Sequence, residues 1–475
     1  MILIYLIGTF LIGIALFFNK ISAVRKSLVI LFLILQWAFT YYEFMHKGIT
    51  EFNYFKPDAI SILLLLTISI ISIPALLHSY DYIYQEKDNR KARSIYYIAM
   101  IFLVMALSAA YVSSHIAVTW IFVEITTLSA SALIFHRRNA GSIEATWKYI
   151  FVCSISITFV FIGILFLSIA LGTSNDDSLH YDSLLKLAPT LNTFWLRLAF
   201  IFIFVGYTAK LGLVPMYTAG IDAKDKAPTP AAALFSSVLM NVGFIGFFRF
   251  YEIIAHTSLH SWANHVVMIA AFLSIFVATV YVLKVKNLKR MLAYSSIEHM
   301  GLIMLGISVG GIGYYAAILH LILHSFAKSA LFLQIGHIYR VYHTKNIYYL
   351  GNYFKYNLSG ALFLLLAFIC VTAMPPSGLF VSEFYIFKAL FVANYIYVLI
   401  PVLLLLTFII WTLAKNIFKI VFIAPIDFDE TKILKINHYE TVSQFVLLGL
   451  VIYLGLNPPV FFDNLINEAV RNLIF

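Results

Sequence analysis

Residues Phe151–Leu171 read FVCSISITFVFIGILFLSIAL, a run of 21 residues that contains no charged side chain. About 20 apolar residues in a helix are enough to cross the hydrocarbon core of a bilayer. Similar runs recur along the whole chain, in which 62% of the residues are hydrophobic and only 11% are charged. Soluble domains carry about twice that share of charge. The sequence therefore predicts an all-α integral membrane protein.

The hydrophobic runs predict about fourteen transmembrane helices. They lie at residues 1–19, 27–44, 58–80, 94–112, 115–135, 147–172, 195–216, 228–252, 264–283, 288–308, 312–339, 358–393, 396–423 and 440–457. We expect four regions in the chain. These are residues 1–92 with helices 1–3, 93–252 with helices 4–8, 253–424 with helices 9–13, and 425–475 with helix 14 and a C-terminal tail.

The basic residues of the connections alternate between the two predicted sides of the membrane. The odd-numbered connections hold most of them: Lys20, Arg25, Lys26, Lys87, Arg90, Lys91, Arg93, Arg137, Arg138, Lys224, Lys226, Lys284, Lys286, Lys289, Arg290, Arg340, Lys345, Lys355, Lys415, Lys419, Lys432 and Lys435. The even-numbered ones hold few: Lys47, Lys56, Lys186, Arg197 and Arg249. By the positive-inside rule, both termini are predicted to face the outer, periplasmic side of a prokaryotic cell membrane. This bias explains the net charge of +10 without nucleic acid as a partner.

A short set of charged residues lies inside these spans or at their edges. An unpaired charge at the bilayer centre costs at least about 2.5–3.5 kcal/mol, so such residues face the protein interior and are functional candidates. Burial favours the neutral forms of lysine and glutamate, which lets both exchange protons. The alternatives are a structural ion pair between helices and, near a span end, a side chain that reaches the interface. The candidates are Glu124, Lys148, Lys210, Glu298, Lys328, Glu383 and Lys388, of which Lys148 and Lys388 lie near span ends.

Two spans contain prolines beside these charges. Proline removes a backbone donor and clashes with the preceding turn, so we predict breaks at Pro215 in helix 7 and at Pro375 and Pro376 in helix 12. Broken helices at corresponding places in two halves point to a transport pathway. Because the breaks are five helices apart, helices 4–8 and 9–13 are predicted to be two repeats. An odd number of crossings in each makes the repeats inverted.

A third cluster lies on helix 11, where His320, His324 and Lys328 are spaced four residues apart and share one face. Histidine titrates near neutral pH and relays protons readily. Two histidines at this spacing could also ligate a metal, but no carboxylate follows and His-Glu-x-x-His is absent, so no metal is predicted. The remaining alternative is a polar stripe that faces a neighbouring helix.

Redox and cofactor motifs are absent from the sequence. Cys153 and Cys370 lie far apart in apolar helices, which indicates neither a disulfide framework nor a metal site. There is no Cys-x-x-Cys set, no P-loop and no dinucleotide glycine motif. We therefore expect no cofactor in this chain and no catalysis by it alone.

Several motifs together resemble a known family, the antiporter-like proton-translocating membrane subunits of respiratory complex I, Mrp-type cation/proton antiporters and membrane-bound nickel–iron hydrogenases. The resemblance covers nearly the whole chain. Its motifs are Phe55-Lys-Pro-Asp58-Ala, Trp120-Ile-Phe-Val-Glu124, Glu144-Ala-Thr-Trp-Lys148-Tyr, Lys210-Leu-Gly-Leu-Val-Pro215, Ala227-Pro-Thr-Pro230, Ser295-Ser-Ile-Glu298-His299-Met-Gly301 and Met374-Pro-Pro-Ser-Gly-Leu-Phe-Val-Ser-Glu383. Those around Lys148 and His299 look most like component F of hydrogenase 4.

The resemblance implies a role for each buried charge. Glu124 matches a helix-5 glutamate that pairs with the lysine of broken helix 7, here Lys210. Lys328, with His320 and His324, matches the centre of a second half-channel, and Glu383 matches its terminal residue. Glu298 and His299 join this pathway through their motif.

The chain departs from the family pattern after Pro215. Where the family has a segment like His-Thr-Trp-Leu-Pro-Asp-Ala-His, this sequence reads Tyr217-Thr-Ala-Gly-Ile-Asp222-Ala-Lys224. It also has Ser236 where some members place a histidine early in helix 8.

The resemblance implies a proton-translocating membrane subunit of a hydrogenase-type or related respiratory oxidoreductase complex. Its expected partners are other membrane subunits, the lipid bilayer and a soluble redox arm with iron–sulfur and, in one variant, nickel–iron subunits. Its ion is the proton, with Na⁺ as an alternative. Two other hypotheses stay open: a subunit for Mrp-like cation/proton antiport or inorganic-carbon uptake, and a scaffold that conducts nothing. The costly buried charges argue against the scaffold.

Overall fold

The computed structural model describes residues 1–85, 90–172, 179–426, 428–430, 433–434 and 436–473. Within these ranges the chain is almost entirely helical, and β-pairing is limited to isolated bridges such as that between Glu51 and Phe55. Three lysines counted in the predicted basic connections, Lys87, Lys432 and Lys435, lie outside the described residues.

The helices follow the predicted spans closely. In the first half of the chain they are α1 (Ile2–Phe18), α2 (Ser22–Met45), α3 (Ala59–Gln85), α4 (Arg90–Val112), α5 (Ile116–Phe135), α6 (Ala140–Leu171), α7 (Tyr181–Leu187), α8 (Thr193–Leu211), α9 (Thr218–Lys226), α10 (Thr229–Phe235) and α11 (Val238–Ala255). In the second half they are α12 (His260–Lys284), α13 (Leu288–Val309), α14 (Ile312–Tyr342), α15 (Tyr353–Tyr356), α16 (Leu358–Val371), α17 (Gly378–Val392), α18 (Ile396–Phe422), α19 (His438–Leu456) and α20 (Val460–Ala469).

Among the described residues, twelve helical segments are long and apolar enough to cross a membrane, with α10 and α11 counted as one. They correspond to every predicted span except the first and the twelfth. The first is α1, with 17 residues, and the twelfth is divided into α16 and α17. The all-α membrane fold is confirmed, while the total of fourteen crossings and the inverted relation of the repeats stay predictions.

Both predicted helix breaks are present. The predicted helix 7 corresponds to α8, which ends at Leu211. Gly212 then takes a left-handed conformation with φ of 75°, and helical structure resumes with α9 at Thr218, beyond Pro215. Glycine adopts this conformation without the steric cost that a side chain would add. The predicted helix 12 corresponds to α16 and α17. Helix α16 ends at Val371, and α17 begins at Gly378, after Pro375 and Pro376. The hydroxyl of Ser377 accepts a hydrogen bond from the Leu379 amide at 3.1 Å and so caps α17.

A third interruption was not predicted. The predicted helix 8 is divided into two helices, α10 and α11, at Ser236 and Ser237. The hydroxyl of Ser237 donates to the Ala233 carbonyl at 2.6 Å. Serine side chains compete in this way with the helical backbone pattern and bend helices. No glycine or proline stands within five residues of the two serines, so the sequence gave no clear sign of this division.

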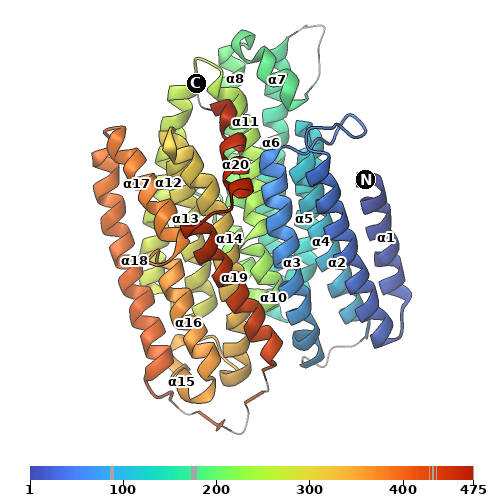
Figure 1. Ribbon diagram of the computed structural model, residues 1–475, viewed down its shortest axis with the longest axis vertical. Coiled ribbons are helices and arrows are strands. Elements are labelled where there is room, and N and C mark those ends of the chain that lie inside the picture. Colours follow the sequence, from blue (N-terminus) through green and yellow to red (C-terminus); the bar gives the residue numbers. More distant parts are fainter. Residues whose placement is uncertain (86–89, 173–178, 427, 431–432, 435, 474–475) are drawn as a thin grey trace.

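Consecutive helices pack side by side in two groups. In the first, α4 packs on α5, α5 on α6, α6 on α8 and α8 on α11; in the second, α12 packs on α13, α13 on α14 and α14 on α17. In Figure 1, α1 and α2 form one edge of the molecule, α17 and α18 form the opposite edge, and α14 lies between them. The connection that contains α7 and the one that contains α15 lie at opposite ends of the bundle, and both chain termini lie in the upper half of the view.

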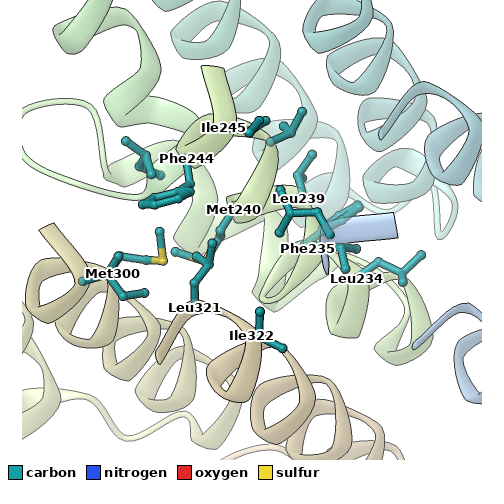
Figure 2. Packing of buried hydrophobic residues seen from close by; sticks show 14 of the residues in the cluster. Leu234, Phe235, Leu239, Met240, Phe244, Ile245, Met300, Leu321 and Ile322 are labelled. Atoms are coloured by element: carbon teal, nitrogen blue, oxygen red, sulfur yellow. The ribbon is translucent and has the colours of Figure 1, made fainter. Parts of the chain in front are cut away.

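The two groups meet at a hydrophobic junction, where α10 packs on α14 and α9 packs on α13. Figure 2 shows side chains of α10 and α11 facing those of α13 and α14, with Met240 close to Leu321. The residues of this junction include Leu234, Phe235, Leu239, Met240, Phe244, Ile245, Met300, Leu321 and Ile322. Apolar side chains of both groups therefore pack together at this junction, where Asn241 of α11 also donates to the Ser325 hydroxyl of α14 at 2.9 Å.

Candidate functional site

Lys210 lies in the last turn of α8, just before the helix break, and is only 4% exposed. Its Nζ donates to the hydroxyl of Thr127 at 2.7 Å and to that of Tyr149 at 3.2 Å, and it lies 5.3 Å from the centre of the Tyr149 ring. The ammonium is thus bound by neutral groups and an aromatic face.

Glu124 lies on α5, one turn before Thr127. Among the residues described, no direct ion pair joins Glu124 to Lys210, although the two charges interact electrostatically. One oxygen of the Glu124 carboxylate, Oε2, is buried and has no hydrogen-bond partner in the described part of the chain. A buried carboxylate oxygen without a partner is unfavourable unless water reaches it. The pairing implied by the resemblance therefore takes the form of two separated groups.

Lys148, predicted at the edge of the pathway, lies apart from this site. Its side chain is 54% exposed, and its Nζ pairs with Glu144 at 2.5 Å and with Asp222 at 3.8 Å. Helix α6 begins at Ala140, seven residues before the predicted span, so Lys148 lies eight residues inside the helix, with its side chain exposed. This position fits a side chain that reaches the membrane surface.

The second group of helices holds a denser site around Lys328 on α14, whose side chain is fully buried. The Nζ of Lys328 donates to the Ser295 hydroxyl on α13 at 2.7 Å. The same hydroxyl interacts with the Glu298 carboxylate, and the charges of Lys328 and Glu298 act on each other. No direct ion pair holds Lys328 within the ranges that the structure covers.

Three buried histidines lie on α13 and α14, the two helices that carry Ser295 and Lys328. His299 on α13 and His320 on α14 share a hydrogen bond of 3.0 Å between Nδ1 and Nε2, and the other ring nitrogen of His320 lies 2.9 Å from the Ser382 hydroxyl on α17. His299 also lies 3.7 Å from the Glu298 carboxylate and 3.9 Å from that of Glu383. The structure thus brings together residues of α13, α14 and α17, which correspond to the predicted helices 10, 11 and 12.

His324 lies beside this chain of contacts, with its ring centre 5.2 Å from that of His299. It is fully buried, and both of its ring nitrogens lack a hydrogen-bond partner among the described residues. Buried polar groups of this kind are typically satisfied by ordered water.

A metal could in principle bind between His299, His320 and Glu383, whose ligand atoms lie within 4.8 Å of one another. The geometry favours proton transfer instead. The facing nitrogens of His299 and His320 already bind each other, and the ammonium of Lys328 acts electrostatically on both rings. A metal cation would have to break the hydrogen bond between the two histidines and overcome the repulsion from the Lys328 ammonium.

Sequence reasoning missed that several cations assigned to connections are buried. Lys224 was assigned to a basic connection, but it is 3% exposed and lies on the short helix α9. Arg340, also assigned to a connection, is buried and binds both oxygens of Glu440 at 2.6 and 2.7 Å. Arg340 stands between apolar and aromatic residues, which is a weak signal of burial, whereas Lys224 stands among charged residues and gave none.

Arg340 and Glu440 belong to a buried cluster with two histidines, His78 on α3 and His337 on α14. The two rings stack with centres 5.4 Å apart, and both lie within 4 Å of the Glu440 carboxylate at 3.5 and 3.7 Å. A bidentate pair of this kind fixes the geometry of the helices that carry it. We assign this cluster a structural role, holding α3, α14 and α19 together.

Arg249 likewise leaves the predicted outer connection. It is buried in α11, lies 3.2 Å from the Asp58 carboxylate and donates to the Tyr111 carbonyl at 2.8 Å. The cation is therefore bound within the protein and is no guide to membrane orientation.

Broken helices beside buried lysines, repeated in two helical groups, define the class of antiporter-like membrane subunits. The profile of the family described as NADH:quinone oxidoreductase/Mrp antiporter, transmembrane, matches residues 113–409, more than half of the chain. The chain belongs to this family.

Curated relatives include hydrogenase-4 subunits. The chain is 28% identical over 347 residues to a hydrogenase-4 component F homolog of Methylacidiphilum infernorum (isolate V4), an alignment that covers 71% of this chain and 73% of the relative. It is 26% identical over 371 residues to hydrogenase-4 component B of Escherichia coli (strain K12), covering 73% of this chain and 54% of that longer protein. The predicted resemblance to this family is confirmed.

Solved structures share the fold. A chain of the membrane-bound sulfane sulfur reductase, an archaeal respiratory membrane complex, superposes with a TM-score of 0.87 and 22% identity over 100% of this chain and 96% of the other. The protein is thus an antiporter-like membrane subunit of the type found in hydrogenase, complex I and Mrp-type complexes.

Proposed function

We propose that this subunit translocates protons within a hydrogenase-type or related respiratory redox complex. The observation that carries the proposal is the state of its two central lysines. Lys210 and Lys328 are both buried in hydrophobic helices and donate to neutral hydroxyls, with no ion pair among the described residues. A lysine that stays charged without a counter-charge is costly at this depth, because burial favours the neutral amine. A lysine that gains and loses a proton can return to that neutral form.

The proposed route runs through both helical groups. In the first group protons pass between Glu124 and Lys210, which are separated and need water between them. In the second they pass between Lys328, the histidines and Glu383. Because neighbouring groups act on one another's charge, a proton gained at one site favours release at the next. Among the residues that the structure describes, His299 and His320 form the only direct histidine-to-histidine hydrogen bond along this route.

The hydrogenase-type assignment rests on the motifs around Lys148 and His299 together with the similarity to hydrogenase-4 components. In this proposal the electron-transfer chemistry belongs to partner subunits with iron–sulfur and, in one variant, nickel–iron centres, and this chain holds no cofactor. Both termini face the outer side of a prokaryotic membrane. Labelling of single cysteines placed at residues 20 and 47, with a reagent that does not cross the membrane, tests that orientation: only the latter should react in intact cells.

The test uses the whole complex, purified through a tag on this chain and reconstituted in vesicles. Proton uptake and electron transfer are recorded together for Lys210→Ala and Lys328→Ala. We expect electron-linked proton translocation to fall by at least about 100-fold in both variants, the size typical of losing a proton-transfer group. Lys388→Ala, which removes an exposed lysine of α17, is the matched control.

Normal proton translocation by both lysine variants would refute the proposal. Copurification with a cation exchange system that lacks any redox subunit would instead support the Mrp-like alternative. Repeating the assay with Na⁺ replaced by K⁺ separates the two ions, because a proton-only path is indifferent to this exchange.

A further inference from the structure

Lys224 is a buried cation that the route above leaves unused. It lies on α9, the short helix between α8 and α10, and is 3% exposed. Its Nζ donates to the sulfur of Met240 at 3.2 Å, a weak acceptor. The short helix that carries it packs against α6 of the first group and α13 of the second. Lys224 therefore lies where the two groups meet.

Two carboxylates stand close to Lys224 in the sequence, yet both are bound elsewhere. Asp222 pairs with Arg290, and Asp225 lies 3.6 Å from both the Arg290 Nε and the Lys345 Nζ. Among the residues that the structure covers, no acid pairs with Lys224. The two carboxylates of α9 therefore pair with cations on other elements, whereas the Lys224 side chain is buried without an acidic partner among the described residues.

On one side, Lys224 shares a small cavity with Lys210. The cavity is lined by both lysines and by Tyr149, Leu239 and Met240, among others, and about 20 Å³ of it is open to the centre of a water molecule. That volume is enough for about one water, which the two lysines and the Tyr149 hydroxyl could bind. On the other side, Met240 lies close to Leu321 of α14, the helix that carries His324 and Lys328, and the charge of Lys224 acts on both of these groups.

We propose that Lys224 is a proton carrier that links the Lys210 site to the Lys328–histidine site across the apolar junction. The inference rests on the proposed function. A protonated Lys210 gives its proton through water to neutral Lys224, so Lys210 becomes neutral and Lys224 becomes an ammonium. Lys224 then releases that proton to His324 or to neutral Lys328. A lysine suits this place because its long flexible stem carries three donors past the methionine side chain.

The experiment compares substitutions of Lys224 in the reconstituted complex. Lys224→Gln should lower proton translocation per electron pair by at least about tenfold, because the carrier is lost. Lys224→Arg should fail in the same way, since a guanidinium keeps the charge but does not release its proton. Lys224→His should restore part of the activity. Lys226→Gln, on the same helix, with a side chain 40% exposed and paired to Asp225, is the control that should leave translocation unchanged.

The outcomes separate this inference from the proposed function. If Lys224→Gln or Lys224→Arg translocates protons normally while Lys210→Ala does not, the link is refuted and the function stands. If Lys210→Ala also translocates normally, the function itself is refuted. Recovery by histidine but not by arginine excludes a purely structural role, because only a group that exchanges protons distinguishes the two.

A separate observation concerns the outer face of α2, α3 and α4. A groove of about 380 Å³ there is lined at one end by Arg25, Lys26 and Arg93 and along its length by apolar residues such as Val29, Leu33 and Leu76. Arg25 is 8% exposed, and its buried Nε has no hydrogen-bond partner among the described residues. Cations near the N-terminus of a helix such as α2 are also opposed by the helix dipole.

We infer that this groove binds one phospholipid with an anionic headgroup. The cations match a phosphodiester, to which arginine donates two hydrogen bonds, and the apolar walls match an acyl chain. Wall residues Ile30 and Leu77 are 47% and 40% exposed, which leaves the groove open to the lipid side.

Thermal unfolding of the complex with added phosphatidylglycerol, phosphatidylcholine or inorganic phosphate tests this site. Phosphatidylglycerol should raise the Tm more than phosphatidylcholine, and Arg25→Gln should weaken its retention by about tenfold, as expected for one charge-assisted hydrogen bond. Lys26→Gln should weaken it less, and Lys20→Gln, an exposed residue of the same connection, should not. An unchanged preference in Arg25→Gln and Lys26→Gln, or equal stabilisation by inorganic phosphate, would contradict the assignment.

Discussion

The two sites that we propose to carry protons use the same framework with different chemistry. In the first helical group the lysine lies on the broken helix, at Lys210, and a continuous helix provides Tyr149. In the second group the lysine lies on the continuous helix α14, at Lys328, and the broken helix provides Glu383. Each ammonium donates at 2.7 Å to one hydroxyl, from Thr127 and Ser295 respectively.

The difference lies in how closely the groups touch. Neither lysine pairs directly with a carboxylate among the described residues, but beside Lys328 two histidines, His299 and His320, and two carboxylates form a nearly continuous set of contacts. A site with gaps depends on water for each transfer, while a site with direct contacts depends on its side chains. Substitutions should therefore act differently on the two sites.

The largest effect is expected for Glu383→Gln, which removes the terminal carboxyl of the second site. Because Glu383 lies 3.9 Å from His299, its loss should lower proton translocation by about 100-fold while electron transfer by the redox arm continues. Vesicle assays that record both quantities check this. Equal translocation by the variant and the native complex would remove Glu383 from the route.

A smaller effect is expected when the contact between His299 and His320 is broken. Each single alanine variant should lower translocation by about tenfold, and the double variant should be no worse than either one, since a single interruption already breaks the relay. Multiplying effects in the double variant would show instead that the two histidines act independently.

The lysine hydroxyl partners offer a matched pair of still milder changes. Thr127→Val and Ser295→Ala each remove one acceptor from a buried ammonium. We expect a loss of about threefold to tenfold in translocation from each, corresponding to one hydrogen bond to a charged group. The Ser295 variant should be the more damaging, because that hydroxyl also interacts with Glu298. The reverse order would contradict the contrast between the two sites.

The smallest effect on transport is expected at the structural cluster. Glu440→Gln leaves Arg340 without its buried bidentate partner and should destabilise the chain by about 3–5 kcal/mol, which a lowered Tm would reveal. The ratio of protons to electrons in the surviving complex should be unchanged. A changed ratio at unchanged Tm would assign Glu440 to the pathway.

Much of this arrangement could be predicted from local signals. Uninterrupted apolar runs indicated the helices, and proline beside a charge indicated the breaks at Pro215 and Pro375. The four-residue spacing of His320, His324 and Lys328 placed them on one face. These features depend on neighbouring residues along the chain, so the sequence contains them directly.

Other features depend on residues far apart in the chain. Glu440 binds Arg340 from 100 residues away, and nothing near either residue indicates the other. Lys224 stands among charged residues typical of a loop, yet partners on other elements bind its neighbours Asp222 and Asp225. Whether a charge faces water or the interior is decided by packing, which local patterns do not report.

The central claim is that the buried lysines act by gaining and losing protons and not as fixed charges. The most direct test is the number of protons translocated per electron pair by the reconstituted complex carrying Lys328→Arg. An arginine keeps the positive charge but does not release its proton. We predict that translocation is lost while electron transfer by the redox arm persists. A native proton-to-electron ratio in this variant would contradict the account.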